Sequence, residues 1–125
     1  MKTTELMVGD WVCLKDDNKY ELPLKIDGVL TDDISLEGEG FLGGAEGLIR
    51  PILITPKMLV KNGWKETQYW HEYQDGKNTI QCCLPDMRGR INGIEIEHFK
   101  CEYVHQYQHL LRLCGLNELA DNFKI

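Results

Sequence analysis

CEYVHQYQHLLRLCG, residues 101–115, is the only long stretch of this chain with a clean helical pattern. At about 100° per residue the apolar side chains gather on one helix face, which carries Tyr103, Val104, Tyr107, Leu110, Leu111 and Cys114. The opposite face carries His105, Gln108, His109 and Arg112, a polar set that predicts a solvated surface. Gly115 suits the left-handed position that follows a helix end. The apolar face must be buried, and a β-sheet built from the preceding residues is its expected partner.

The composition is that of a small, acidic, folded protein. With 125 residues, the chain is long enough for one domain or two very small ones. The hydrophobic content of 42% supports a buried core. Twenty acidic residues against 14 basic ones give a formal net charge of −6, which argues against nucleic acid as a partner. Lys77, Arg88 and Arg90 are the nearest approach to a basic patch, and acidic residues are interleaved with them.

The lack of a targeting signal and the cysteine usage predict a cytoplasmic protein without a membrane partner. The first ten residues contain no apolar core of a signal peptide, and no segment has the apolar length of a membrane span. The five cysteines are an odd number, and the adjacent pair at 82 and 83 is a poor disulfide framework. We therefore expect reduced thiols.

The first half, residues 1–54, has the pattern of short strands separated by close turns. Strand composition begins at Trp11, and Asp27–Gly28 predicts a turn after the next strand. Pro23 cannot donate to a sheet ladder, so its strand is expected at an edge. The glycine-rich stretch 37–47 predicts no regular structure. Strands this short and this closely spaced predict an SH3-like partial β-barrel.

The second half, residues 55–125, combines helix and hairpin signals. Thr55 and Pro56 predict the N-cap and first turn of a short helix that ends at Asn62–Gly63. Asp75–Gly76 and Asn92–Gly93 predict hairpin turns. The expected fold is therefore α+β: an SH3-like partial barrel, then an antiparallel β-meander packed against the C-terminal helix. The two halves are expected either to pack separately or to share one core.

Gly38-Glu39-Gly40-Phe41-Leu42-Gly43 matches the dinucleotide-binding pattern G-x-G-x-x-G by letter. That motif requires a helix to open at its third glycine, so that free N–H groups face a pyrophosphate. The residues that follow do not start a helix, and Glu39 and Glu46 would repel phosphate. We expect a loop or a tightly bent strand pair here, and no cofactor.

Metal and thiol chemistry supply the alternative to a binding function. His105 and His109 are four residues apart, as in zinc proteases, but Gln106 replaces the required glutamate base. Cys101 lies one turn earlier and could join the two histidines, with a fourth ligand from His98, Cys82 or Cys83. The short ligand pairs of structural zinc sites are absent from the sequence. Cys83 is the stronger candidate for a reactive thiol, because Cys82 lies on the apolar strand face.

Three groups of motifs in the chain resemble those of a known family. They are MVGDWV at 7–12, LITP with NGW between 53 and 64, and YVHQYQ with LLRLCG between 103 and 115. In this order they resemble a family of small uncharacterised bacterial proteins associated with mobile elements and prophages. The resemblance covers nearly the whole chain. It implies that the two halves belong together, and it implies no activity.

Aromatic residues are concentrated around one predicted strand, and they are the candidate partner-binding residues: Trp64, Tyr69, Trp70 and Tyr73. Exposed aromatics mark protein contacts, and buried aromatics dominate cores, so both outcomes are open. No catalytic, cofactor-binding or metal-binding residues are expected. The leading hypothesis is a non-enzymatic binding or adaptor protein of a bacterial mobile element that binds a protein partner or itself. The alternative is a small metal-dependent or thiol enzyme that uses Cys83 or the row of Cys101, His105 and His109.

Overall fold

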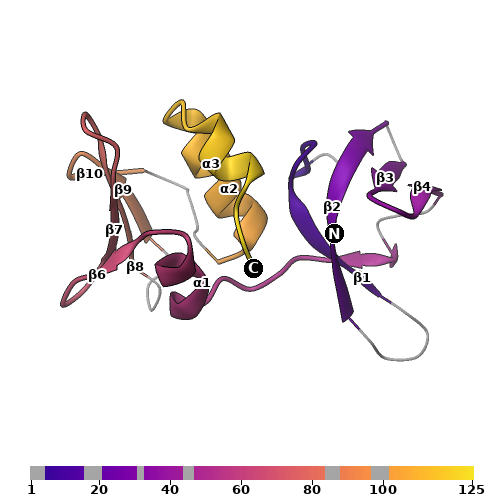
Figure 1. The fold of residues 1–125 in the computed structure, drawn as a ribbon, viewed down its shortest axis with the longest axis horizontal. Helices are drawn as coiled ribbons and strands as arrows, with labels where there is room; N and C mark the ends of the chain where they lie inside the picture. Colours follow the sequence, from indigo (N-terminus) through magenta and orange to yellow (C-terminus); the bar gives the residue numbers. More distant parts are fainter. Residues whose placement is uncertain (1–4, 16–20, 31–32, 44–46, 84–87, 97–101) are drawn as a thin grey trace. The chain divides into compact units, whose positions relative to one another are not determined.

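A computed structural model describes residues 5–15, 21–30, 33–43, 47–83, 88–96 and 102–125 (Figure 1). The chain forms two compact units, Met1–Ile52 and Leu53–Ile125. Each unit contains an antiparallel five-stranded sheet, and the described α-helices belong to the second unit. The fold is α+β, as the sequence predicts. None of the helices in the described ranges has the length and hydropathy needed to cross a membrane.

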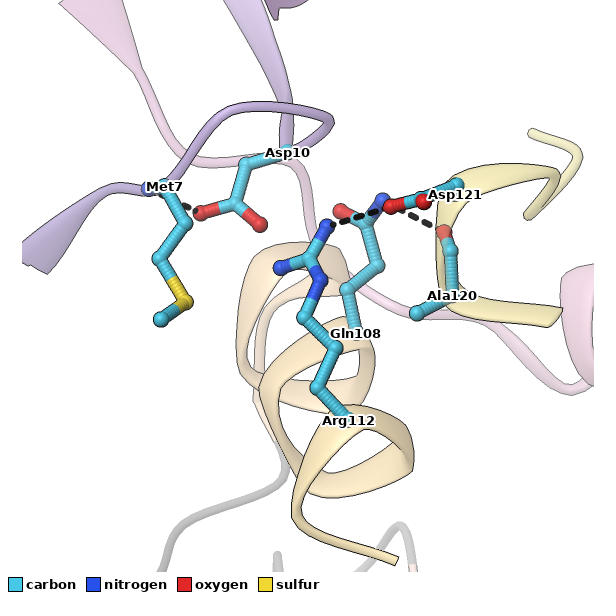
Figure 2. A network of polar contacts seen from close by, with 6 residues as sticks. All are labelled: Met7, Asp10, Gln108, Arg112, Ala120 and Asp121. Carbon is cyan, nitrogen blue, oxygen red and sulfur yellow. Dashed lines mark hydrogen bonds and ion pairs between the residues drawn. The ribbon is translucent and has the colours of Figure 1, made fainter. Parts of the chain in front are cut away.

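The sheet of the first unit has the strand order β4-β3-β2-β1-β5. Its strands are β1 (Trp11–Lys15), β2 (Glu21–Val29), β3 (Ile34–Leu36), β4 (Gly40–Leu42) and β5 (Ile49–Arg50). The buried core beneath it consists of Leu6, Val12, Ile26, Ile34, Leu36 and Ile49. Before β1, the N–H of Met7 donates to the buried carboxylate of Asp10 at 2.8 Å (Figure 2). That bond closes the turn that leads into the sheet.

Strand β2 departs from the sequence expectation. The predicted turn at Asp27–Gly28 is wrong, because β2 runs through it and bends at a register shift between Ile26 and Gly28. Residues 21–25 pair with β1, and residues 26–29 pair with β3. Pro23 therefore lies in the middle strand of the sheet, but in the half that pairs on one side only. Its missing N–H interrupts no second ladder there.

The glycine-rich motif forms the hairpin of β3 and β4. Gly38 and Gly40 have φ values of +83° and +73°, which L side chains rarely adopt. These two residues reverse the chain tightly, and β4 then pairs with β3 from Gly40 to Leu42. The expectation of irregular structure is therefore wrong for these three residues. From Gly38 to Gly43 the motif is a tightly bent strand pair. Residues 44–46, which include Glu46, lie outside the described residues.

The sheet of the second unit is a meander in which strands adjacent in sequence pair with each other, in the order β10-β9-β8-β7-β6. Its strands are β6 (Lys65–Glu66), β7 (His71–Gln74), β8 (Thr79–Cys83), β9 (Arg88–Ile91) and β10 (Ile94–Glu95). The helices are α1 (Pro56–Lys61), α2 (Val104–Leu113) and α3 (Asn117–Asp121). Thr55 caps α1 by accepting from the N–H of Met58, as predicted. Asn92 and Gly93, both with positive φ, turn β9 into β10.

Helix α2 begins at Val104, three residues later than the start of the quoted stretch. Gln106 determines this start, because its side-chain oxygen accepts from the N–H groups of Glu102 at 2.9 Å and Tyr103 at 3.0 Å. At the other end Gly115 has φ +80°, and the N–H of Leu116 donates to the carbonyl of Leu111 at 2.9 Å. This is the glycine-terminated helix end that the sequence predicts.

The polar face of α2 is not the solvated surface that its sequence predicts. His105 and Gln108 are buried. The side-chain amide of Gln108 donates to the carbonyl oxygen of Ala120 at 3.0 Å, and Arg112 pairs with Asp121 at 3.3 Å (Figure 2). The short helix α3 therefore folds back onto α2. Burial of Gln108 is tolerated because its amide has a hydrogen-bond partner there.

Candidate functional site

The four candidate aromatic residues separate into two environments. Trp64 is buried, with its ring centroid 5.8 Å from that of Tyr73 and 5.8 Å from that of Tyr107 on α2. The ring of Trp64 meets that of Tyr107 edge-on, an arrangement that aromatic cores favour. Trp64 and Tyr73 thus belong to the packing of the second unit. Tyr69 and Trp70 belong to the second environment, at the turn between β6 and β7.

Tyr69 lies at the tip of the turn between β6 and β7. The turn is closed by Thr67, whose N–H donates to the carbonyl of Trp70 at 2.7 Å and whose hydroxyl accepts from the N–H of Trp70 at 3.2 Å. Gln68 and Tyr69 form the tip between them. Tyr69 is 70% exposed, a high value for a large aromatic side chain. The local hydrogen bonds hold the backbone on both sides of it.

Strand pairing determines which side chains lie near Trp70. Glu72, Gln81, Arg90 and Glu95 are successive cross-strand neighbours from β7 to β10. Because side chains alternate between the faces of a strand, these four share one face, which we call the polar face of the meander. Ile80 and Cys82, on the opposite face, are fully buried. Trp70, two positions before Glu72, lies on the polar face.

Two arginines lie over the indole ring of Trp70. The guanidinium carbon of Arg90 is 4.2 Å from the ring centroid, and that of Arg88 is 5.7 Å away. Arg88 also pairs with Glu95 at 3.5 Å. We call Tyr69, Trp70, Arg88, Arg90 and Glu95 the arginine–tryptophan cluster. A guanidinium stacked on an aromatic face keeps its N–H groups directed outward in its own plane, where they suit carboxylate or phosphate oxygens.

The sequence indicates only part of this cluster. Its aromatic stretch points to Tyr69 and Trp70, whereas Arg88 and Arg90 resemble a basic patch weakened by nearby acids. Strand register brings the arginines to Trp70. Asn92–Gly93, a strong two-residue turn signal, determines which residues of β9 and β10 face each other, and therefore places Arg90 opposite Glu95.

The thiols are less accessible than the enzyme alternative requires. Cys83 lies on the strand face opposite to Cys82, as expected, yet both side chains are buried. Cys83 is the cross-strand partner of Arg88, on the face that Trp70 also occupies. A buried thiol is ordinarily inert towards substrates and alkylating reagents.

Cys114, the residue that ends α2, supplies a pH-dependent prediction. Burial raises the pKa of its thiol, and Asp75 and Cys82 raise it further. A raised folded-state pKa favours the protonated thiol, so this contribution to stability is complete below the unfolded pKa of about 8.5. It is lost as pH rises through the folded-state pKa. We expect the free energy of unfolding to fall more steeply as pH rises above the unfolded pKa in the wild type than in Cys114→Ser.

Urea unfolding at a series of pH values, followed by circular dichroism, measures this difference in slope. Comparison with Cys114→Ser removes the contribution of every other group that titrates in the same range. Parallel pH profiles for the two proteins would contradict the prediction.

The histidines of α2 lie close together. The ring centroids of His105 and His109 are 5.7 Å apart, and the ring of Tyr103 stacks on His105 at 5.9 Å. Cys101 and His98, the other ligands of the metal hypothesis, lie outside the described residues. Within the described ranges no group of three or more His, Cys, Asp or Glu residues is arranged to hold a metal ion. Because Cys101 and His98 lie outside those ranges, the metal-binding alternative stays untested.

The second unit has two concavities whose lining residues are known. One of about 330 Å³ is lined by Gly63, Lys65, Glu72, Tyr73 and Gln74. The other, of about 290 Å³, is lined by Thr55, Lys57, Met58, Lys61 and Ile125. Among the described residues, neither lining includes a histidine or a cysteine.

Comparisons with protein-family models, with curated proteins and with solved structures give no match to this chain.

Proposed function

We propose that this chain is a non-enzymatic binding or adaptor protein of a bacterial mobile element. It acts in the cytoplasm through protein–protein contacts, and the arginine–tryptophan cluster is its contact surface. The observation that carries the proposal is the 70% exposure of Tyr69, the residue immediately before Trp70, over whose ring two arginines lie. Tyrosine, tryptophan and arginine are the residue types that supply most of the binding energy in protein interfaces.

The rigidity of the turn supports this assignment. Thr67 makes hydrogen bonds to both the N–H and the carbonyl of Trp70, so the backbone around Tyr69 is held before any partner arrives. Binding through a held turn loses little conformational entropy, and more of the contact energy then appears as affinity. The packing of Trp64 against Tyr107 shows, by contrast, how an aromatic residue of the same stretch contributes to the core.

The fold of the first unit, the biological setting, the class of partner and the compartment are each supported by a separate observation. The bend of β2 between β1 and β3 supports an SH3-like partial barrel for the first unit, with β4 and β5 as its two edges. The assignment to a mobile element is based on the sequence resemblance. The net charge of −6 favours a protein partner over nucleic acid. Cysteines 13, 82, 83 and 114 as thiols suit a reducing compartment.

Site-specific photo-crosslinking tests the proposed contact surface. A photoreactive phenylalanine analogue replaces Tyr69 in one protein and Leu113 in a matched control, because both side chains are 70% exposed. Both proteins are irradiated in cells at native expression level. We expect a discrete crosslinked product from position 69 and none from position 113. Excess unlabelled wild type should compete for the product, and a Trp70→Leu competitor should not. Equal crosslinking at the two positions would refute the assignment.

A further inference from the structure

We propose that the arginine–tryptophan cluster binds carboxylate side chains of an acidic protein segment, with Arg90 as the anchoring residue. This inference rests on the proposed function and names the chemistry of its partner. The geometry of Arg90, the position of Glu95 and the charges of the surrounding face lead to it.

Arg90 is oriented for a planar anion. Its guanidinium lies 4.2 Å from the centroid of the Trp70 ring, and its side chain is half-buried. Within the described residues no ion pair is formed by Arg90. The guanidinium lies over the indole, and among the described residues no acceptor takes its N–H groups. A carboxylate matches a guanidinium through two parallel hydrogen bonds, and prior stacking reduces the rotamer freedom lost on binding.

Glu95 marks where such a carboxylate would lie. It is opposite Arg90 across β9 and β10 and 3.5 Å from Arg88. The side chains of Arg88 and Glu95 are 45% and 48% exposed, and an ion pair this exposed contributes little to stability. A carboxylate from a partner can therefore replace Glu95 at small cost. Glu72, the other acid in this row, instead accepts a hydrogen bond from Gln81.

The charges favour the carboxylates of a protein segment over a nucleic acid. Two acidic residues, Glu72 and Glu95, share the polar face with the arginines. These acids and the net charge of −6 repel any anion, so the planar fork of Arg90 and not the net charge must select the partner. A nucleic acid gains its affinity from many basic residues that neutralise successive phosphates, and two arginines beside two acids do not supply them. An acidic peptide can place one or two of its carboxylates on the arginines.

The test uses the full chain and two labelled probes, a hexaglutamate peptide and a hexathymidine oligonucleotide, in fluorescence-anisotropy titrations at low and physiological salt. Arg90→Lys keeps the charge and removes the planar fork. Lys77→Gln, in the exposed β7–β8 turn, removes one positive charge away from the cluster. Glu95→Gln removes the carboxylate that competes with the peptide for the arginines. Circular dichroism checks that each variant is folded.

We expect hexaglutamate to bind the wild type, and Arg90→Lys to weaken that binding at least about fivefold. Lys77→Gln should change it less than about twofold, because a distant exposed charge is largely screened. Glu95→Gln should tighten binding by up to about fivefold, the largest gain expected from releasing an exposed ion pair.

Equal losses in Arg90→Lys and Lys77→Gln would overturn the inference, because binding would then follow net charge alone. An unchanged or lower affinity in Glu95→Gln would also overturn it, and so would tighter binding of hexathymidine than of hexaglutamate. Crosslinking at position 69 without hexaglutamate binding would refute the acidic partner and leave the proposed function standing. Hexaglutamate binding without crosslinking would refute the proposed function instead.

Discussion

Tyr107→Ala is expected to lower the free energy of unfolding by about 3–5 kcal/mol, the usual cost of deleting a buried aromatic ring. Tyr107 is fully buried on α2, and its ring meets the edge of Trp64 at a centroid distance of 5.8 Å. Removing the ring leaves a cavity between α2 and the segment that enters the meander, and that cavity cannot collapse without moving Trp64. Urea unfolding followed by tryptophan fluorescence and circular dichroism measures the loss.

Leu113→Ala is the matched control for this substitution. Leu113 lies on the same helix and is 70% exposed. We expect its replacement to change the free energy of unfolding by less than about 0.5 kcal/mol. A loss of under about 1 kcal/mol in Tyr107→Ala would contradict the packing of α2 against Trp64, since a buried aromatic ring cannot be deleted so cheaply.

Ile34→Ala is expected to destabilise the first unit by about 2–5 kcal/mol. Ile34 is fully buried in a core that includes Leu36 and Ile26. It pairs with Leu42 on β4 and with Val29 on β2, so its loss opens a cavity where both pairings meet. Hydrogen exchange of the amides of β1, β2 and β3 measures the change within this unit.

Leu30→Ala tests whether burial, rather than the loss of any aliphatic side chain nearby, causes this effect. Leu30 is 57% exposed and lies just beyond the end of β2. Its replacement should leave the exchange rates of the same amides within about twofold of the wild type, because exposed substitutions rarely exceed 0.5 kcal/mol. Comparable acceleration in both variants would show that Ile34 does not belong to the core described above.

Local signals predicted the ends of the helices and the tightest turns. Thr55 and Pro56 start α1, Gly115 follows α2 with a left-handed backbone, and Asn92–Gly93 closes the last hairpin. Each of these features depends on a residue's own conformational preference or on hydrogen bonds to residues within one turn. Such preferences act at short range, so the sequence reveals them directly.

The sequence predictions that were wrong fail because of tertiary contacts, which local preferences do not reveal. Asp27–Gly28 has turn chemistry, but pairing of β2 with β1 and then with β3 keeps the chain extended and converts the irregularity into a bend. The polar face of α2 reads as solvent-exposed, yet Gln108 meets the carbonyl of Ala120 on α3. In both cases a partner distant in sequence satisfies the backbone or side chain, and tertiary structure overrides the local preference.

The sequence by itself determined the α+β class, the capped ends of α1, the apolar stripe of α2 and the presence of an aromatic stretch around Tyr69. Tertiary structure alone decided that Trp64 enters the core while Trp70 lies on the polar face beneath Arg90. The reason is physical: strand register brings together side chains twenty residues apart, and a shift of one residue would turn each of them to the other face. The candidate binding surface is a product of that register.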